Sequence, residues 1–189
     1  LVWSPSAAVS AASQGLSGDA PVVAVSPDGG HLVLVWREAD PAGQSSRILL
    51  RRSSDRGNTF APPILLAEVA TAETALGPPH IADVGQDVYV LWATTTLSTD
   101  TSALWLAHSD TAGETFPNSA QHLHTVQGET QYHLTAKANQ VAVVWTDPGQ
   151  GGLFVRQSND RGQTFEAPER VEDGIFPVAS APALQVTEA

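Results

Sequence analysis

Three short apolar runs, each ending in a tryptophan, recur along the chain at residues 32–36, 88–92 and 141–145. A shorter run precedes each of them across a tight turn, and another run follows each of them after a variable loop. The runs are rich in Val and Leu and lie between Gly, Pro, Asn and Asp residues, which is typical of strands. No long 3.6-residue periodicity survives the 13 Pro and 15 Gly of the chain. We therefore expect an all-β protein.

An eight-residue segment also occurs three times, in step with the tryptophan runs. It lies at residues 53–60, 109–116 and 158–165, and its central glycines are 56 and 49 residues apart. Each copy leads into a fourth, more polar run. Four antiparallel strands in roughly 50 residues, repeated along a chain, are typical of the blades of a β-propeller.

The repeat predicts a β-propeller of four-stranded antiparallel blades, with about three full blades plus terminal strands. We assign residues 19–70, 71–127 and 128–174 to three blades. Residues 1–18 are assigned to a terminal strand and an Ala/Ser-rich segment, and residues 175–189 to the first strand of a further blade. Either the ends meet and close a small ring, or the chain is a segment of a longer propeller. Ends that fall within predicted strands favour the segment.

The repeated segment reads Ser-x-Asp-x-Gly-x-Thr-Phe and resembles the Asp-box, or bacterial neuraminidase repeat, of sialidase-like β-propellers. Asp55 and Asp160 stand in full matches, whereas Thr111 takes the place of the aspartate in the middle copy. A short Asp side chain accepts hydrogen bonds from its own turn, and a glycine tolerates a positive φ there. We interpret the boxes as folding elements, because equivalent residues of successive blades cannot converge on one substrate. The structural box residues are Ser53, Asp55, Gly57, Thr59, Phe60, Ser109, Gly113, Thr115, Phe116, Ser158, Asp160, Gly162, Thr164 and Phe165.

The resemblance further implies three arginines that grip a substrate carboxylate, a tyrosine nucleophile paired with a glutamate, and an aspartate acid/base. Arginine suits the first role because its planar fork binds a carboxylate through two hydrogen bonds. The early Phe/Tyr-Arg-Ile-Pro motif of that family is absent. Arg37 follows a tryptophan run and can reach a central face, but four other arginines are features of the repeat: Arg51, Arg56, Arg156 and Arg161.

The two tyrosines of the chain are expected to have different roles. Tyr89 lies within an apolar run and is predicted to be core, whereas Tyr132, with Glu129 nearby, is a conceivable nucleophile. No arginine cluster is visible to complete a site around Tyr132. We therefore assign no catalytic residue, and the ligand-binding residues are unknown at this stage.

His122 and His124 are the best candidates for metal ligands, because residues two apart in a strand point to one face. No carboxylate stands at a spacing that completes such a site, so a solvated polar face is the preferred interpretation. The acidic, glycine-rich stretches at residues 28–30 and 146–152 lack the alternating oxygen ligands of calcium loops and are interpreted as turns. We expect no metal and no cofactor.

Composition narrows the classes of partner. The 189 residues carry a net charge of -11 and no cysteine. The acidic excess argues against nucleic-acid partners, and no apolar run approaches the roughly 20 residues that span a bilayer. The missing cysteines exclude a disulfide framework and thiol chemistry. The chain begins at Leu1 without a charged leader, which suggests a processed or trimmed N-terminus.

The first functional hypothesis is a non-catalytic, extracellular or cell-surface propeller that acts as a binding or scaffold module for a protein or a glycan. The alternative is a segment of an Asp-box exo-sialidase or other glycoside hydrolase whose catalytic residues lie largely outside this chain. A further alternative is a subunit of a surface filament or sheath, in which blade edges pair between self-associating chains.

Overall fold

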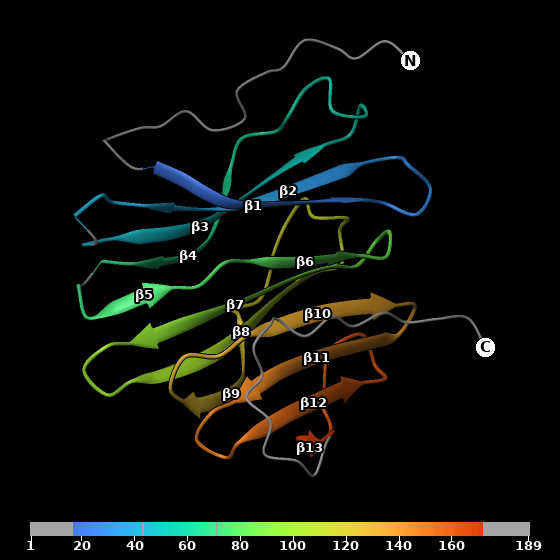
Figure 1. Ribbon diagram of the computed structural model, residues 1–189. Coiled ribbons are helices and arrows are strands. Elements are labelled where there is room, and N and C mark those ends of the chain that lie inside the picture. Colours follow the sequence, from blue (N-terminus) through green and yellow to red (C-terminus); the bar gives the residue numbers. More distant parts are fainter. Residues whose placement is uncertain (1–16, 43, 71, 172–189) are drawn as a thin grey trace, which may run out of the picture.

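The computed structural model describes residues 17–42, 44–70 and 72–171, in which the regular structure is entirely β. Three antiparallel sheets succeed one another from the N-terminal to the C-terminal end (Figure 1): sheet A (β1–β4), sheet B (β5–β9) and sheet C (β10–β13). No helix that could cross a membrane occurs among these residues. The strands are β1 (Ser17–Val25), β2 (Leu32–Ala39), β3 (Ser46–Ser53), β4 (Ile64–Val69), β5 (Thr74–Leu76), β6 (His80–Asp83), β7 (Val88–Thr96), β8 (Thr101–Ser109), β9 (Gln121–Gln127), β10 (Tyr132–Lys137), β11 (Gln140–Asp147), β12 (Gly152–Ser158) and β13 (Glu169–Arg170).

Sheets A and C are meanders, in which each strand pairs with the next strand along the chain. Sheets A and C have four strands in chain order, as the repeat predicts. The first strands of the three sheets lie side by side, because β6 contacts both β1 and β10. The three sheets therefore share an inner edge formed by β1, β6 and β10.

Sheet B differs from the prediction of four strands, because its inner edge is divided into β5 and β6, and both pair with β7. The break falls at Gly77, Pro78 and Pro79. A proline has no N–H to donate to a sheet ladder, so two consecutive prolines interrupt the strand. Sheet A is irregular at the same place, where β1 has a register shift between Asp19 and Val22.

The core lies between the sheets, in two layers, and β7 belongs to both. Val88, Val90 and Trp92 point into the layer shared with sheet A, whereas Tyr89 and Leu91 point into the layer shared with sheet C. All five side chains are buried, which confirms that this apolar run is a strand covered on both faces. Tyr89 is a core residue, as predicted.

The three box segments form turns of one design between the third and fourth strands. In the first turn, Asp55 accepts hydrogen bonds from the Ser53 hydroxyl at 2.7 Å, the Thr59 amide at 2.8 Å and the Thr59 hydroxyl at 2.6 Å. Asp160 accepts the equivalent three bonds from Ser158 and Thr164, at 2.5–2.9 Å. These bonds favour the ionised carboxylates, and the Thr hydroxyls contribute most to lowering the pKa of each aspartate to about 2.

The box glycines have positive φ values of 89°, 79° and 77°. The residues before them, Arg56, Ala112 and Arg161, have positive φ values as well, and the sequence pattern does not indicate this. Two consecutive left-handed residues direct the glycine N–H back to the serine hydroxyl at the start of the turn, at 2.8–3.0 Å in all three copies.

The second and third box turns also pack on the preceding sheet. Gly113 lies against Val33 of sheet A, and Gly162 lies against Tyr89 and Leu106 of sheet B. Phe116 and Phe165 enter the core layers between the same pairs of sheets. The box turns thus stand where one sheet meets the next.

Candidate binding site

The two ends of the sheets differ in what they carry. The box turns lie at the end where the first and second strands are joined, because Ala112 and Arg161 donate backbone hydrogen bonds to residues 86 and 139 in those turns. We call this the box end. At the opposite end β2, β7 and β11 finish, and β1 and β5 begin.

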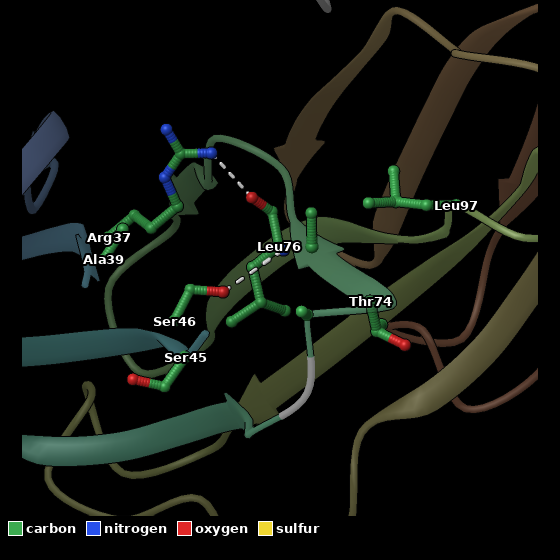
Figure 2. Close-up of a pocket in the computed structure, with 9 residues that line it drawn as sticks. Arg37, Ala39, Ser45, Ser46, Thr74, Leu76 and Leu97 are labelled. Carbon is green, nitrogen blue, oxygen red and sulfur yellow. Dashed lines mark hydrogen bonds between the residues drawn. The ribbon is translucent and has the colours of Figure 1, made fainter. Parts of the chain in front are cut away.

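A cavity of about 290 Å³ opens at this opposite end, between sheets A and B (Figure 2). Its walls combine small apolar side chains, three hydroxyl groups and one guanidinium group. Such a mixture of apolar surface and a few convergent polar groups is typical of small-ligand sites. The lining residues are Arg37, Ala39, Ser45, Ser46, Ala72, Thr74, Ala75, Leu76 and Leu97.

Arg37 is the charged group of the cavity, and its partners come from both sheets. Its Nε and Nη2 donate to the two carboxylate oxygens of Asp19 at 2.7 and 2.6 Å. Its Nη1 donates to the carbonyl of Leu76 at 2.6 Å, across the boundary between the sheets (Figure 2). The hydrogen bonds to Asp19 raise the pKa of Arg37 above its usual value. Arg37 lies where sheets A and B meet, and a carboxylate already occupies its fork.

The fold itself produces this pair. Asp19 in β1 and Arg37 in β2 are direct partners in the antiparallel register, so their side chains leave the same face of sheet A. The Arg37 side chain is 27% exposed and that of Asp19 is 46% exposed, so a ligand can reach the polar edges of both.

The hydroxyl groups and the apolar wall complete the cavity. The Ser46 hydroxyl accepts the N–H of Leu76 at 3.4 Å, a second link between the sheets (Figure 2). Leu97 is 60% exposed and adds an apolar side chain to the cavity lining.

Tyr132, considered above as a nucleophile, is unsuited to that role. Its hydroxyl donates to the carbonyl of Pro78 at 2.7 Å and accepts the N–H of Ala93 at 3.1 Å. Burial raises the pKa of Tyr132 and disfavours the phenolate. Gly77 makes room for this hydroxyl, because a Cβ at that position would collide with it. Tyr132 therefore links sheets B and C, and Glu129 is not among the hydrogen-bond partners of its hydroxyl.

His80 and His133 stand beside Tyr132 at the inner edge. The His80 ring packs edge-on against Tyr132 at 5.3 Å and against His133 at 5.1 Å. Burial lowers the pKa of His80 to about 4 and also lowers the pKa of His133. Both imidazoles are therefore neutral at pH 7 and act as packing groups.

His122 and His124 do not form a joint metal site. His122 Nε2 is 2.9 Å from the Thr125 hydroxyl, and the His124 ring lies 4.8 Å from that of Trp145. A carboxylate does lie near His124, contrary to the expectation from spacing, because Asp147 Oδ2 is 4.0 Å from its Nε2. Within the described ranges no group of three or more His, Cys, Asp or Glu side chains is placed to hold a metal ion.

Sequence reasoning missed two histidine–aspartate pairs. His31 Nε2 is 2.9 Å from Asp83 Oδ2 across the boundary of sheets A and B, and His108 Nε2 is 2.7 Å from Asp87 Oδ1 within sheet B. The members of each pair are far apart in the chain, so no local motif signals them.

No protein-family model matches the chain, and no curated protein matches it. Solved structures do match. The chain is similar to an α-L-arabinanase from Penicillium chrysogenum complexed with arabinobiose, with a TM-score of 0.51 and 12% identity over 74% of this chain. It is also similar to the GH93 α-L-arabinofuranosidase of Fusarium graminearum with arabinobiose, with a TM-score of 0.51 and 12% identity over 83% of this chain.

The match spans only part of these enzymes, 42% of the first chain and 50% of the second. At 12% identity the likeness concerns the fold alone. That fold is the all-β propeller type, with antiparallel sheets arranged as in these glycoside hydrolases.

Proposed function

We propose that this chain is part of a sialidase-like β-propeller that binds a neutral glycan outside the cell and does not hydrolyse it. The observation that carries the proposal is the cavity between sheets A and B, with the Arg37–Asp19 pair at its edge. A sugar ring presents an apolar C–H face and a rim of hydroxyl groups. The apolar face can pack against the side chains of Ala39, Ala75 and Leu97. The sugar hydroxyl groups can form hydrogen bonds with the Arg37–Asp19 pair and with the serine hydroxyls.

The charge of the site favours a neutral over an acidic sugar. Recognition of a carboxylate needs a guanidinium whose fork is free. The fork of Arg37 is closed by Asp19, and the net charge of -11 repels anions. A sialic acid would have to displace Asp19 from Arg37, whereas a neutral sugar uses the remaining donors and acceptors of the pair.

The proposed absence of hydrolysis rests on the candidate nucleophile and on the carboxylate beside the cavity. Tyr132 is the best nucleophile candidate of the sequence, and both hydrogen-bonding functions of its hydroxyl are used within the fold. Glycoside hydrolysis ordinarily takes two carboxyl groups on opposite sides of the scissile bond. Asp19 is the only carboxylate that the described residues place in contact with the Arg37 edge of the cavity, and it is held by that arginine.

The second candidate function is a segment of a glycoside hydrolase. It is supported by the similarity to arabinan-degrading enzymes and by the chain spanning half of their length or less. The remaining catalytic groups would then belong to parts of a propeller beyond the described residues.

Binding is tested with arabinobiose and sialyllactose as probes, by isothermal titration calorimetry on the purified chain. We expect arabinobiose to bind and sialyllactose to bind at least tenfold more weakly. Ala75→Trp fills the cavity from an exposed position and should abolish binding. Ala61→Trp, at an exposed position next to a box turn, is the matched control and should bind as the parent does.

Equal binding by Ala75→Trp and the parent would show that the cavity is not the binding site. Tighter binding of sialyllactose than of arabinobiose would contradict the argument from charge. Hydrolysis of a fluorogenic arabinofuranoside or sialoside by the purified chain would replace the first function by the second.

A further inference from the structure

One wall of the cavity between sheets A and B is a strand with a very short ladder. Every residue of β5 (Thr74–Leu76) lines the cavity, and β5 pairs with β7 over only three residues. Beyond Leu76 the ladder is interrupted, and it resumes at His80 in β6. The position of this cavity wall therefore depends on what holds the segment between β5 and β6.

That segment contains a β-bulge. β5 ends opposite Thr94 and β6 begins opposite Leu91, so the three residues 77–79 face the two residues 92 and 93 of β7. A bulge leaves its extra residue outside the regular pairing and bends the strand. Buried backbone groups at such a place need other hydrogen-bond partners, and these partners determine the shape of the bulge.

The Tyr132 hydroxyl occupies the gap that the bulge leaves in the ladder. It accepts the N–H of Ala93 in β7 at 3.1 Å and donates to the carbonyl of Pro78 at 2.7 Å. One hydroxyl from sheet C thus bridges two backbone segments of sheet B, as a main-chain pair does elsewhere in the ladder. Tyr132 is 4% exposed, so removal of its hydroxyl leaves the Ala93 N–H without this acceptor in a buried place.

Arg37 binds the same segment from sheet A. Its Nη1 donates to the carbonyl of Leu76 at 2.6 Å, two residues before the Pro78 carbonyl that accepts from Tyr132. Arg37 and Leu76 line the cavity, whereas Tyr132 is not among the described residues that line it. Side chains of sheets A and C are therefore both bound to one short segment of sheet B, and β5 is continuous with that segment.

We propose that Tyr132 is a positioning residue for the cavity: its hydroxyl fixes the bulge at residues 77–79, and the bulge fixes β5 against sheet A. This role rests on the proposed binding of a sugar in the cavity. A wall that is in place before the ligand arrives spares the ligand the free energy of ordering it. Without the hydroxyl, β5 is in place in only a fraction of the molecules, and the apparent affinity falls by that fraction.

Tyr132→Phe and Tyr89→Phe form a matched pair of variants. Each removes a tyrosine hydroxyl from the core layer between sheets B and C, but the Tyr89 hydroxyl donates at the box end, to the carbonyl of Arg161 at 3.3 Å. Isothermal titration calorimetry with arabinobiose should show about tenfold weaker binding by Tyr132→Phe. Tyr89→Phe should bind as the parent does. Circular dichroism establishes that each variant is folded at the temperature of the titration.

Amide hydrogen exchange followed by NMR supplies a readout that needs no ligand. In the parent the Gly77 N–H donates to the carbonyl of Ala93 at 2.9 Å and should be protected from exchange. Tyr132→Phe should accelerate exchange at Gly77 and Leu76, because the bulge loses a bond that holds it. Tyr89→Phe should leave both rates unchanged, whereas a general loss of stability would accelerate exchange in both variants.

If the parent binds arabinobiose and the two variants bind it equally, whether tightly or weakly, Tyr132 has no positioning role and the proposal is overturned. If the parent does not bind arabinobiose, the proposed function fails, and the exchange rates decide on Tyr132. Unchanged exchange at Gly77 in Tyr132→Phe would then overturn the positioning role, and selectively faster exchange would support it.

Discussion

The hydroxyl of Thr111 accepts the backbone N–H of Thr115 at 2.9 Å, a hydrogen bond that the carboxylates of Asp55 and Asp160 accept in the other two box turns. The Thr111 and Thr115 hydroxyls are also 2.9 Å apart. A neutral side chain therefore reproduces the hydrogen-bonding pattern of the box. We propose that the aspartates serve the turn and not catalysis, since the turn forms in the same way without the charge.

Restoring the missing carboxylate at position 111 should stabilise the middle box turn. A charged acceptor makes stronger hydrogen bonds than a hydroxyl, so Thr111→Asp is expected to raise the melting temperature of the chain. Thr111→Ala removes the acceptor and should lower the melting temperature. Differential scanning calorimetry checks both variants, and a lower melting temperature for Thr111→Asp than for Thr111→Ala would refute the equivalence of the three turns.

Acid should destabilise the box turns in a defined range. The pKa of Asp55 and of Asp160 is about 2 in the folded chain, against roughly 3.9 for an unperturbed aspartate. A lowered folded pKa means that the stabilisation is complete above the unfolded value and is lost as the pH falls from about 4 to about 2. Melting temperatures measured across this range should fall more steeply for the parent than for the double variant Asp55→Asn/Asp160→Asn. Parallel curves would contradict the assignment.

The burial of His80 predicts a second dependence of stability on pH, in a higher pH range. Its pKa of about 4 lies below the roughly 6.5 of a free histidine, because burial penalises the imidazolium. The unfolded chain therefore takes up a proton before the folded chain does, and stability is lost as the pH falls from about 6.5 to about 4. His80→Phe should flatten the dependence of the melting temperature on pH in this window. NMR titration should show that the His80 ring stays neutral at pH 5, and an ordinary midpoint near 6.5 would contradict the burial argument.

Gly77 and Tyr132 should be coupled in stability. A methyl group at Gly77 meets the Tyr132 hydroxyl, so Gly77→Ala is expected to cost about 1–3 kcal/mol, as overpacking does. Tyr132→Phe removes the obstructing oxygen and leaves the Ala93 N–H without that acceptor, at a cost of about 1–3 kcal/mol. The double variant should be more stable than the sum of the two costs implies, as measured by urea unfolding. Strictly additive losses would show that the collision is relieved elsewhere.

Much of the architecture follows from local patterns that the sequence displays directly. Strands 88–96 and 140–147 contain the predicted tryptophan runs, because β-branched and apolar residues between turn formers favour extended backbone wherever they are placed. The strands extend past the tryptophans into polar residues, such as the threonines at the end of β7, and the apolar pattern does not predict this extension. The box glycines adopt positive φ as expected, because the turn chemistry is contained within eight residues.

The site depends on relationships between distant segments, which no local pattern encodes. Arg37 is visible in the sequence as an arginine after a tryptophan run, but its bond to the Leu76 carbonyl exists only because sheet B packs against sheet A. The same packing brings His31 to Asp83, and the packing of sheet C on sheet B places the Tyr132 hydroxyl against Gly77. Hydrogen bonds within a turn join residues a few positions apart, so the sequence pattern is enough to predict the turn. Which side chains meet between sheets depends on the register and rotation of whole sheets, and only the packed chain specifies these.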